Sequence, residues 1–172
     1  SRKNQINKVA KAVTWGEYWA ILGPRQIGKT TFLRQLPYSY TDPCYIYFNF
    51  EVCPNKKEEF YQWISKTLVE GIPEKEIDRV IKGKIDSPDK FLDFLKGLKL
   101  KQEGKKVVLL FDEIELIPSV NEFLRIWRNI FHERSHKKEL EKYSVVITGS
   151  VDLIKATDGE TSPFNIASTH YI

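Results

Sequence analysis

The residue pattern that most directly indicates chemistry is Gly-Pro-Arg-Gln-Ile-Gly-Lys-Thr at positions 23–30. It has the form G-x-x-x-x-G-K-T, in which glycines let successive backbone N–H groups converge on a phosphate. An apolar run at 18–22 precedes it and a helical pattern at 31–36 follows it. This strand–loop–helix setting disfavours a chance glycine turn and predicts a nucleoside triphosphate site. The residues predicted to bind the phosphates are Gly23, Pro24, Arg25, Gln26, Ile27, Gly28, Lys29, Thr30 and Thr31.

Two side chains of this loop have separate predicted roles. We expect the Lys29 ammonium to reach the β- and γ-phosphates and to act in catalysis, and the Thr30 hydroxyl to bind Mg²⁺. Arg25 would contact phosphate or a partner. The guanine-reading pattern Asn-Lys-x-Asp is not formed, because the nearest candidate at 55–58 lacks the aspartate and lies too early in the chain. ATP is therefore the predicted nucleotide, with adenine contacts expected from residues 3–19.

A second acidic element follows the apolar run at 107–111. Asp112 and Glu113 end this predicted strand, which we expect to lie beside the strand of the phosphate loop. Ligands bind beyond the carboxyl ends of parallel strands, so Asp112 would bind Mg²⁺ through water and Glu113 would polarise the attacking water. The alternative is an exposed acidic pair that opens a turn, which the upstream phosphate loop disfavours. Glu115 is expected to face solvent.

Two hydroxyl side chains end the next predicted strand, at 143–148. Thr148 and Ser150 would place a hydroxyl near the γ-phosphate, the sensor position of the additional-strand, catalytic-glutamate division of phosphate-loop proteins. Such hydroxyls also serve as helix caps, and Ser150 would cap the turn at 151–154. The sequence leaves both interpretations open.

A basic stripe runs along the amphipathic helix predicted around 120–131. Arg125, Arg128 and His132 lie opposite its apolar face. They could supply an arginine finger to a neighbouring subunit's γ-phosphate, although a solvated helix face is the favoured interpretation. The remaining histidines have no metal-ligand spacing, so we predict no zinc site.

The composition bounds the class of protein. The chain has 172 residues, of which 41% are hydrophobic, so we expect one globular domain with a substantial core. A net charge of +4 permits an acidic or nucleic-acid partner without requiring one. Two cysteines, Cys44 and Cys53, form neither a disulfide framework nor a zinc cluster, which fits a cytoplasmic protein. No apolar run approaches 18 residues, so we predict no membrane span.

Strand-like and helical patterns alternate along the chain, which predicts an α/β fold with a mostly parallel sheet covered on both faces. Strands are expected at 18–22, 44–50, 107–111 and 143–148, and the apolar pair Tyr171-Ile172 reads as the start of a strand cut by the end of the chain. Helices are expected at 6–13, 31–36, 60–71, 74–82, 87–98 and 120–131.

Four motifs together resemble the bacterial AAA-like domain family. They are the phosphate loop at 23–30, Phe-Asp-Glu-Ile at 111–114, Thr-Gly-Ser at 148–150 and Ser-Pro-Phe-Asn-Ile at 162–166. The resemblance covers about residues 17–172, and that family is related to STAND signalling NTPases and to origin-recognition-type ATPases. It implies a P-loop NTPase three-layer sandwich, with a five-stranded sheet of the additional-strand, catalytic-glutamate type.

The resemblance also implies that residues 1–172 form one ATPase domain of a longer protein. In that family a winged-helix domain, an effector region and a second sensor arginine often follow, and we expect them downstream. Their absence from this chain makes slow turnover the expectation.

Three functional hypotheses follow. The leading one is an ATP-binding, slowly ATP-hydrolysing switch whose nucleotide state controls homo-oligomerisation or an attached effector. The second is a DNA-associated loader or regulator, suggested by the lysine-rich stretches. The third is a nucleotide-binding scaffold without turnover. A small-molecule kinase ranks lower, because 73–98 supplies only one arginine for a lid.

Overall fold

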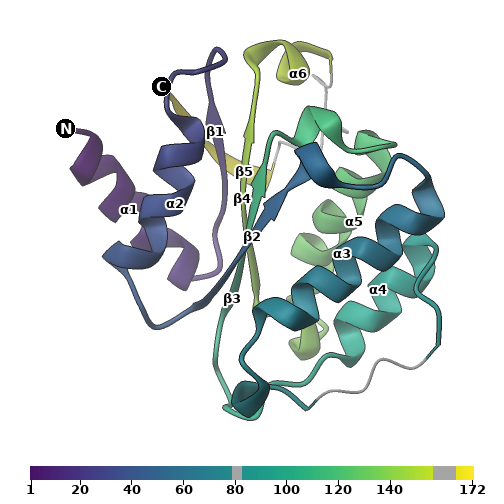
Figure 1. Ribbon diagram of the computed structural model, residues 1–172. Coiled ribbons are helices and arrows are strands. Elements are labelled where there is room, and N and C mark those ends of the chain that lie inside the picture. Colours follow the sequence, from purple (N-terminus) through teal and green to yellow (C-terminus); the bar gives the residue numbers. More distant parts are fainter. Residues whose placement is uncertain (79–82, 157–165) are drawn as a thin grey trace.

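The computed structural model describes residues 1–78, 83–156 and 166–172 as a three-layer α/β sandwich (Figure 1). Its centre is a five-stranded sheet of order β2-β3-β4-β1-β5, in which every neighbouring pair is parallel. This arrangement confirms the predicted fold class. The strands are β1 (Tyr18–Leu22), β2 (Cys44–Asn49), β3 (Val107–Asp112), β4 (Tyr143–Gly149) and β5 (Ala167–Tyr171).

One expectation about the sheet is wrong. The acidic strand β3 does not lie beside β1, because β4 is inserted between them. Ile21 of β1 pairs with Thr148 of β4, and on the other side of β4 Ile147 pairs with Phe111 of β3. The order of strands depends on where each helical crossover returns the chain, which local sequence patterns do not encode.

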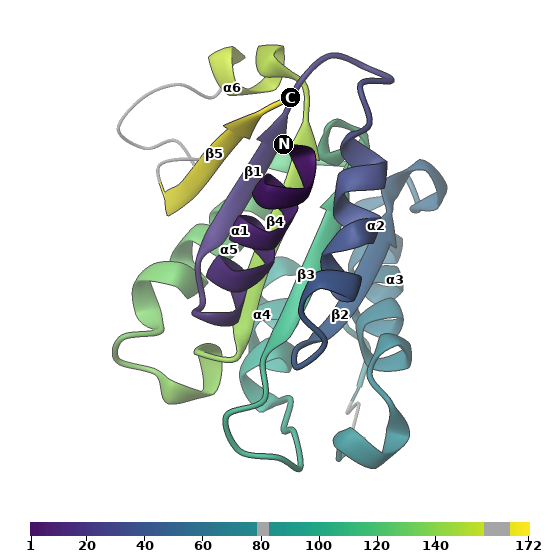
Figure 2. The same ribbon diagram turned by 90° about the vertical axis from the view of Figure 1, so that its left-hand side faces the viewer.

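Helices cover both faces of the sheet (Figures 1 and 2). One face carries α1 (Arg2–Thr14) and α2 (Lys29–Ser39), and the other carries α3 (Lys57–Gly71), α4 (Pro88–Gly97) and α5 (Val120–Glu133). The sheet's side chains alternate between two cores: Trp19 and Ile21 pack with α1 and α2, whereas Ala20 and Leu22 pack on the opposite side. Burial on both faces explains the almost continuous apolar runs of the strands.

Local signals placed several elements correctly. Ser87 caps α4 by accepting a hydrogen bond from the Lys90 N–H, with Pro88 in the first turn. The helix expected at 74–82 is wrong where the structure describes it: Glu74–Glu76 is a single 3₁₀ turn, η2. Residues 79–82, like the Ser-Pro-Phe-Asn part of the fourth motif, lie outside the described residues.

Two C-terminal elements are longer than the sequence indicated. β5 extends over Ala167–Tyr171 and pairs in parallel with all of β1. Its polar residues follow from its place at the edge of the sheet, which removes the apolar signal of a central strand. A short helix, α6 (Val151–Ala156), follows β4. None of the helices in the described ranges is long and apolar enough to cross a bilayer.

An aromatic core lies directly beneath the acidic end of β3. The Phe111 ring contacts Phe48, Phe123 and Trp127, with ring centroids 5.1, 5.2 and 5.5 Å away. Phe50, in the 3₁₀ turn η1 (Phe50–Val52) after β2, packs against the same ring. Close packing of rigid rings holds the residue before Asp112 in one position. The core therefore fixes where the acidic pair emerges from the sheet.

Candidate functional site

The loop between β1 and α2 has a backbone that only certain residues adopt. Gly28, which precedes the first helical residue Lys29, has a φ of 99°, and Gln26 has a φ of 61°. At Gly23 a Cβ atom would lie 2.9 Å from the carbonyl oxygen of Ile172. Positive φ and close backbone approach both favour glycine. The glycines of the motif are therefore required by the shape of the loop.

The Lys29 side chain folds back across this loop. Its Nζ donates a hydrogen bond to the Gly23 carbonyl at 2.8 Å and another to the Pro24 carbonyl. An ammonium group has three N–H donors, so two anchor the side chain to the start of the loop and one is left for a ligand. Lys29 also begins α2, whose N-terminus favours anions.

Asp112 joins the phosphate loop to the second half of the site. Its Oδ2 accepts hydrogen bonds from the Thr30 hydroxyl at 2.7 Å and the Tyr47 hydroxyl at 2.6 Å, and its Oδ1 accepts one from Thr148 at 2.6 Å. Asp112 as a whole residue is only 4% exposed. Three hydroxyl donors from three different elements thus satisfy a buried charge. The structure brings together Thr30 and Asp112, the two predicted Mg²⁺ ligands, which lie far apart in the sequence.

Glu113 stands next to this group in a left-handed backbone conformation, with φ 57° and ψ 57°. Its N–H donates to the Thr148 hydroxyl at 2.9 Å. Burial raises the pKa of the Glu113 carboxyl, and the neighbouring carboxylates of Glu51 and Asp112 raise it further. A carboxylate with a raised pKa is a stronger base, which suits the predicted role of polarising a water molecule.

A family model described as an AAA domain matches residues 16–169. The chain belongs to this AAA domain family. An uncharacterised ATP-binding protein of Methanocaldococcus jannaschii is 25% identical in an alignment that covers 69% of this chain and 39% of that protein. The chain thus spans well under half the length of this relative. The match and the site geometry together support a nucleotide-binding AAA-type ATPase domain.

Solved structures share the fold of this AAA domain. Cdc6p from Pyrobaculum aerophilum aligns with a TM-score of 0.65 at 20% identity, over 99% of this chain and 44% of that one. Orc1 from Aeropyrum pernix, solved in complex with DNA, aligns with a TM-score of 0.57 at 14% identity, over the same shares of the two chains. At these identities the likeness shows the fold alone.

The two hydroxyls at the end of β4 take different positions in the AAA domain. Thr148 is fully buried against Asp112, whereas the Ser150 hydroxyl accepts a hydrogen bond from the Leu153 N–H at 3.4 Å and so caps α6. The Ser150 N–H donates to a carboxylate oxygen of Glu115. Glu115 is exposed, as expected, but it also ties the end of β4 to the turn after β3. A nucleotide contact by either hydroxyl remains a prediction.

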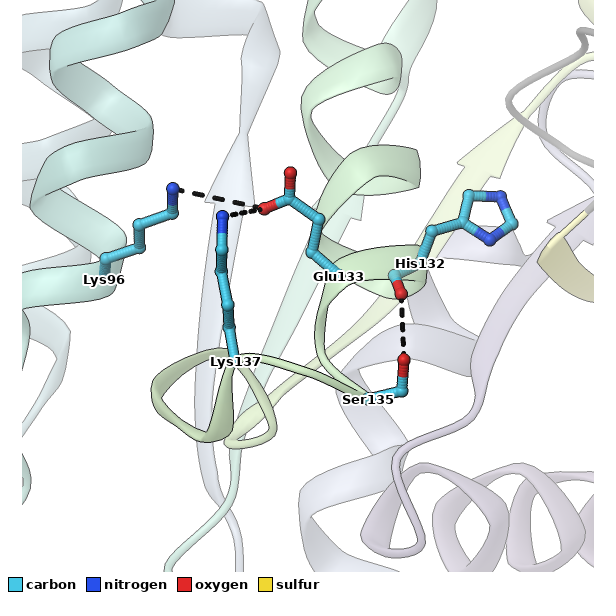
Figure 3. Close-up of polar contacts among 5 residues, drawn as sticks. All are labelled: Lys96, His132, Glu133, Ser135 and Lys137. Atoms are coloured by element: carbon cyan, nitrogen blue, oxygen red, sulfur yellow. Dashed lines mark hydrogen bonds and ion pairs between the residues drawn. The ribbon is translucent and has the colours of Figure 1, made fainter.

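The C-terminal end of the predicted basic stripe lies away from the phosphate loop within one molecule. α5 runs from the Glu113 end of β3 back to the start of β4, so His132 stands at the opposite end of the sheet. Figure 3 shows its ring directed away from neighbouring Glu133, whose carboxylate bridges Lys137 at 2.9 Å and Lys96 at 4.0 Å. The neighbourhood is a solvated, ion-paired surface. An arginine finger from this helix remains a prediction.

Sequence reasoning missed four residues around the site. Tyr47, on β2, contacts Asp112, and Glu51, in η1 directly after β2, contacts Glu113. Arg34, one turn after Thr30 on α2, stacks its guanidinium 4.4 Å above the Tyr47 ring. Arg2 reaches the phosphate loop from α1. The only signal in the sequence was that an otherwise apolar strand carries tyrosines. This signal does not show which residue of the acidic strand each tyrosine would face.

Proposed function

We propose that this domain binds ATP with Mg²⁺, hydrolyses it slowly, and uses the difference between the ATP and ADP states as a switch. The observation that carries the proposal is the hydrogen bond between Thr30 and Asp112, with Glu113 as the next residue. The phosphate loop, the Thr30 hydroxyl, the Asp112 carboxylate and Glu113 lie in one group, and this supports the proposed roles of cradle, metal ligands and base. No single one of these features points to hydrolysis, but their convergence supports it.

The donor set fits Mg²⁺. Hydroxyl and carboxylate oxygens are hard ligands, and Mg²⁺ characteristically binds one or two protein groups together with the substrate's phosphates. Within the described ranges, no group of three or more His, Cys, Asp or Glu residues could hold a metal by itself. The ion is therefore expected to arrive with the triphosphate. When bound, it would neutralise charge on the phosphates between Thr30 and Asp112.

The chain's own residues then have defined tasks. The free donor of Lys29 contacts the β- and γ-phosphates, while the N–H groups at the start of α2 hold the phosphate chain. Thr148 keeps Asp112 and the Glu113 backbone in fixed relative positions, because it bonds to both. Glu113 orients the attacking water by accepting its hydrogen bond. Loss of the γ-phosphate removes contacts at this edge of the sheet, which is the physical basis of a switch.

Two substitutions test the assignment. Lys29→Ala should abolish ATP and ADP binding in titration calorimetry, whereas Glu113→Gln should keep nucleotide affinity within about threefold and abolish phosphate release. Glu59→Gln, on an exposed position of α3, is the matched control for loss of one carboxylate. Hydrolysis by the Glu113 variant at the parental rate would refute the catalytic role.

The switch itself is tested by oligomeric state. Sedimentation velocity with ATP, in the Glu113→Gln background, should show association that ADP does not support. A nucleotide-independent sedimentation coefficient would argue against control of self-assembly and leave an attached effector as the proposed output. ATP binding without measurable phosphate release would favour the scaffold hypothesis.

DNA association remains the second candidate. It is supported by the net charge of +4 and by the fold shared with an Orc1 protein solved on DNA. Affinity for duplex DNA that falls steeply with salt would support it, because phosphate contacts release counterions. Absence of binding at 50 mM salt would count against it.

A further inference from the structure

Arg2, at the start of α1, contacts the phosphate loop directly. Its Nη2 donates a hydrogen bond to the Ile27 carbonyl at 3.0 Å. Its Nη1 lies 2.8 Å from the position that a Cβ atom on Gly28 would occupy. The guanidinium therefore lies against the turn that leads into Lys29. This contact joins two segments separated by the whole of α1 and β1.

The contact is held in place by a well-packed helix. The apolar face of α1 is buried against α2, through Ile6, Val9, Ala10 and Val13 on one side and Phe32, Leu33 and Leu36 on the other. Figure 2 shows the two helices side by side, with the N-terminus of α1 at the same end of the sheet as the start of α2. Because α1 cannot shift without breaking this packing, the backbone at Arg2 is kept within reach of the loop.

The chemistry of the contact favours a role in holding the loop in its ligand-binding form. A guanidinium group has five N–H donors, and no carboxylate pairs with Arg2 in the part of the chain that the structure describes. The Ile27 carbonyl follows Gln26, whose positive φ is an uncommon conformation for a side chain-bearing residue. A donor on this carbonyl stabilises the turn in the form that presents its N–H groups to phosphate.

We infer that Arg2 is a positioning residue of the nucleotide site and that docking of α1 is coupled to nucleotide binding. The inference rests on the proposed function, since it assumes that the loop binds phosphates. Arg2 acts through the loop, by holding the Ile27–Gly28 turn ready for the ligand. Coupling between two equilibria is reciprocal. If nucleotide binds more tightly when Arg2 contacts the loop, then bound nucleotide must favour the packing of α1 on α2 by the same factor.

The experiment compares Arg2→Gln with Lys3→Gln. Both substitutions remove one positive charge from an exposed position at the start of α1. Unlike Arg2, Lys3 makes no hydrogen bond or ion pair with the phosphate loop in the part of the chain that the structure describes. We expect Arg2→Gln to weaken the binding of ADP and of inorganic tripolyphosphate about fivefold, and Lys3→Gln to change it less than twofold. In hydrolysis, Arg2→Gln should raise KM and leave kcat unchanged, because the contact between Arg2 and the Ile27 carbonyl stabilises the ground state and the transition state equally.

A second readout separates coupling from a merely structural role. Amide hydrogen exchange across residues 6–13 should slow on addition of ADP in the parent and in Lys3→Gln, and should slow about fivefold less in Arg2→Gln. Arg2→Lys should restore only part of the affinity, because an ammonium lacks the planar fork. Equal ligand affinities for the two glutamine variants would overturn the inference, as would a loss of thermal stability without a loss of affinity. If Lys29→Ala also binds tripolyphosphate normally, the proposed function itself fails.

Discussion

Tyr47 and Tyr45 offer a matched pair for testing how the buried carboxylate of Asp112 is held. The two tyrosines lie two residues apart on β2, so their side chains leave the same face of the strand. The Tyr47 hydroxyl donates to Asp112 at 2.6 Å, whereas the Tyr45 hydroxyl is buried with no hydrogen-bond partner among the described residues. Replacing either with phenylalanine removes the same single oxygen atom from very different surroundings.

The expected magnitudes follow from those surroundings. Burial and Asp112 raise the pKa of Tyr47 to about 12, so its hydroxyl stays protonated and donates at neutral pH. A hydrogen bond to a charged group contributes about 1.5–3 kcal/mol, so Tyr47→Phe should lower the free energy of unfolding by about 2 kcal/mol. Tyr45→Phe removes a buried, unpaired hydroxyl and should leave stability unchanged or raise it by up to about 1 kcal/mol.

Urea denaturation, followed by tryptophan fluorescence in EDTA without nucleotide, measures both values. Leaving out the ligand keeps the comparison on the hydrogen bond itself, because binding would add its own stabilisation. The m-value should be the same for the parent and both variants, since neither change alters the surface exposed on unfolding. If the two variants differ by less than about 0.5 kcal/mol, or if Tyr45→Phe is the less stable one, the hydrogen-bond argument for Asp112 is wrong.

Two further predictions concern charge and packing. The pKa of Glu113 is raised above its ordinary 4.5 in the folded state. The stability that the protonated carboxyl contributes is therefore present below pH 4.5 and is lost as the pH rises from 4.5 through the folded-state pKa. Urea denaturation curves across this pH range should show that Glu113→Gln becomes more stable relative to the parent as the pH rises. At Gly71 a Cβ would lie 2.7 Å from the Ile46 side chain, whereas at Gly97, which also ends a helix, it would meet nothing within 4 Å in the described part of the chain. Gly71→Ala should therefore cost about 1–3 kcal/mol and Gly97→Ala should be neutral or stabilising, by calorimetric melting.

Most of the features that could be predicted from the sequence depend on residues that lie close together in the chain. The phosphate loop depends on a contiguous run of eight residues, so its conformation, its glycines and the role of Lys29 can be inferred without any tertiary information. The same is true of the cap at Ser87 and of the apolar runs that form the strands. The polar edge strand β5 gave only a weak signal at its last residues, because an edge position does not demand apolar side chains.

Pairings across long distances could not be obtained in this way. That Thr30, Tyr47 and Thr148 would share one carboxylate depends on the strand order β2-β3-β4-β1, and therefore on the path of each crossover. The same holds for Arg2, whose position follows from the packing of α1 on α2. By itself the sequence determined that the chain has a phosphate loop, an acidic strand end and an α/β fold. Only the tertiary structure decided which hydroxyls surround Asp112 and which helix holds the loop, because contacts between distant segments are set by packing and not by neighbouring residues.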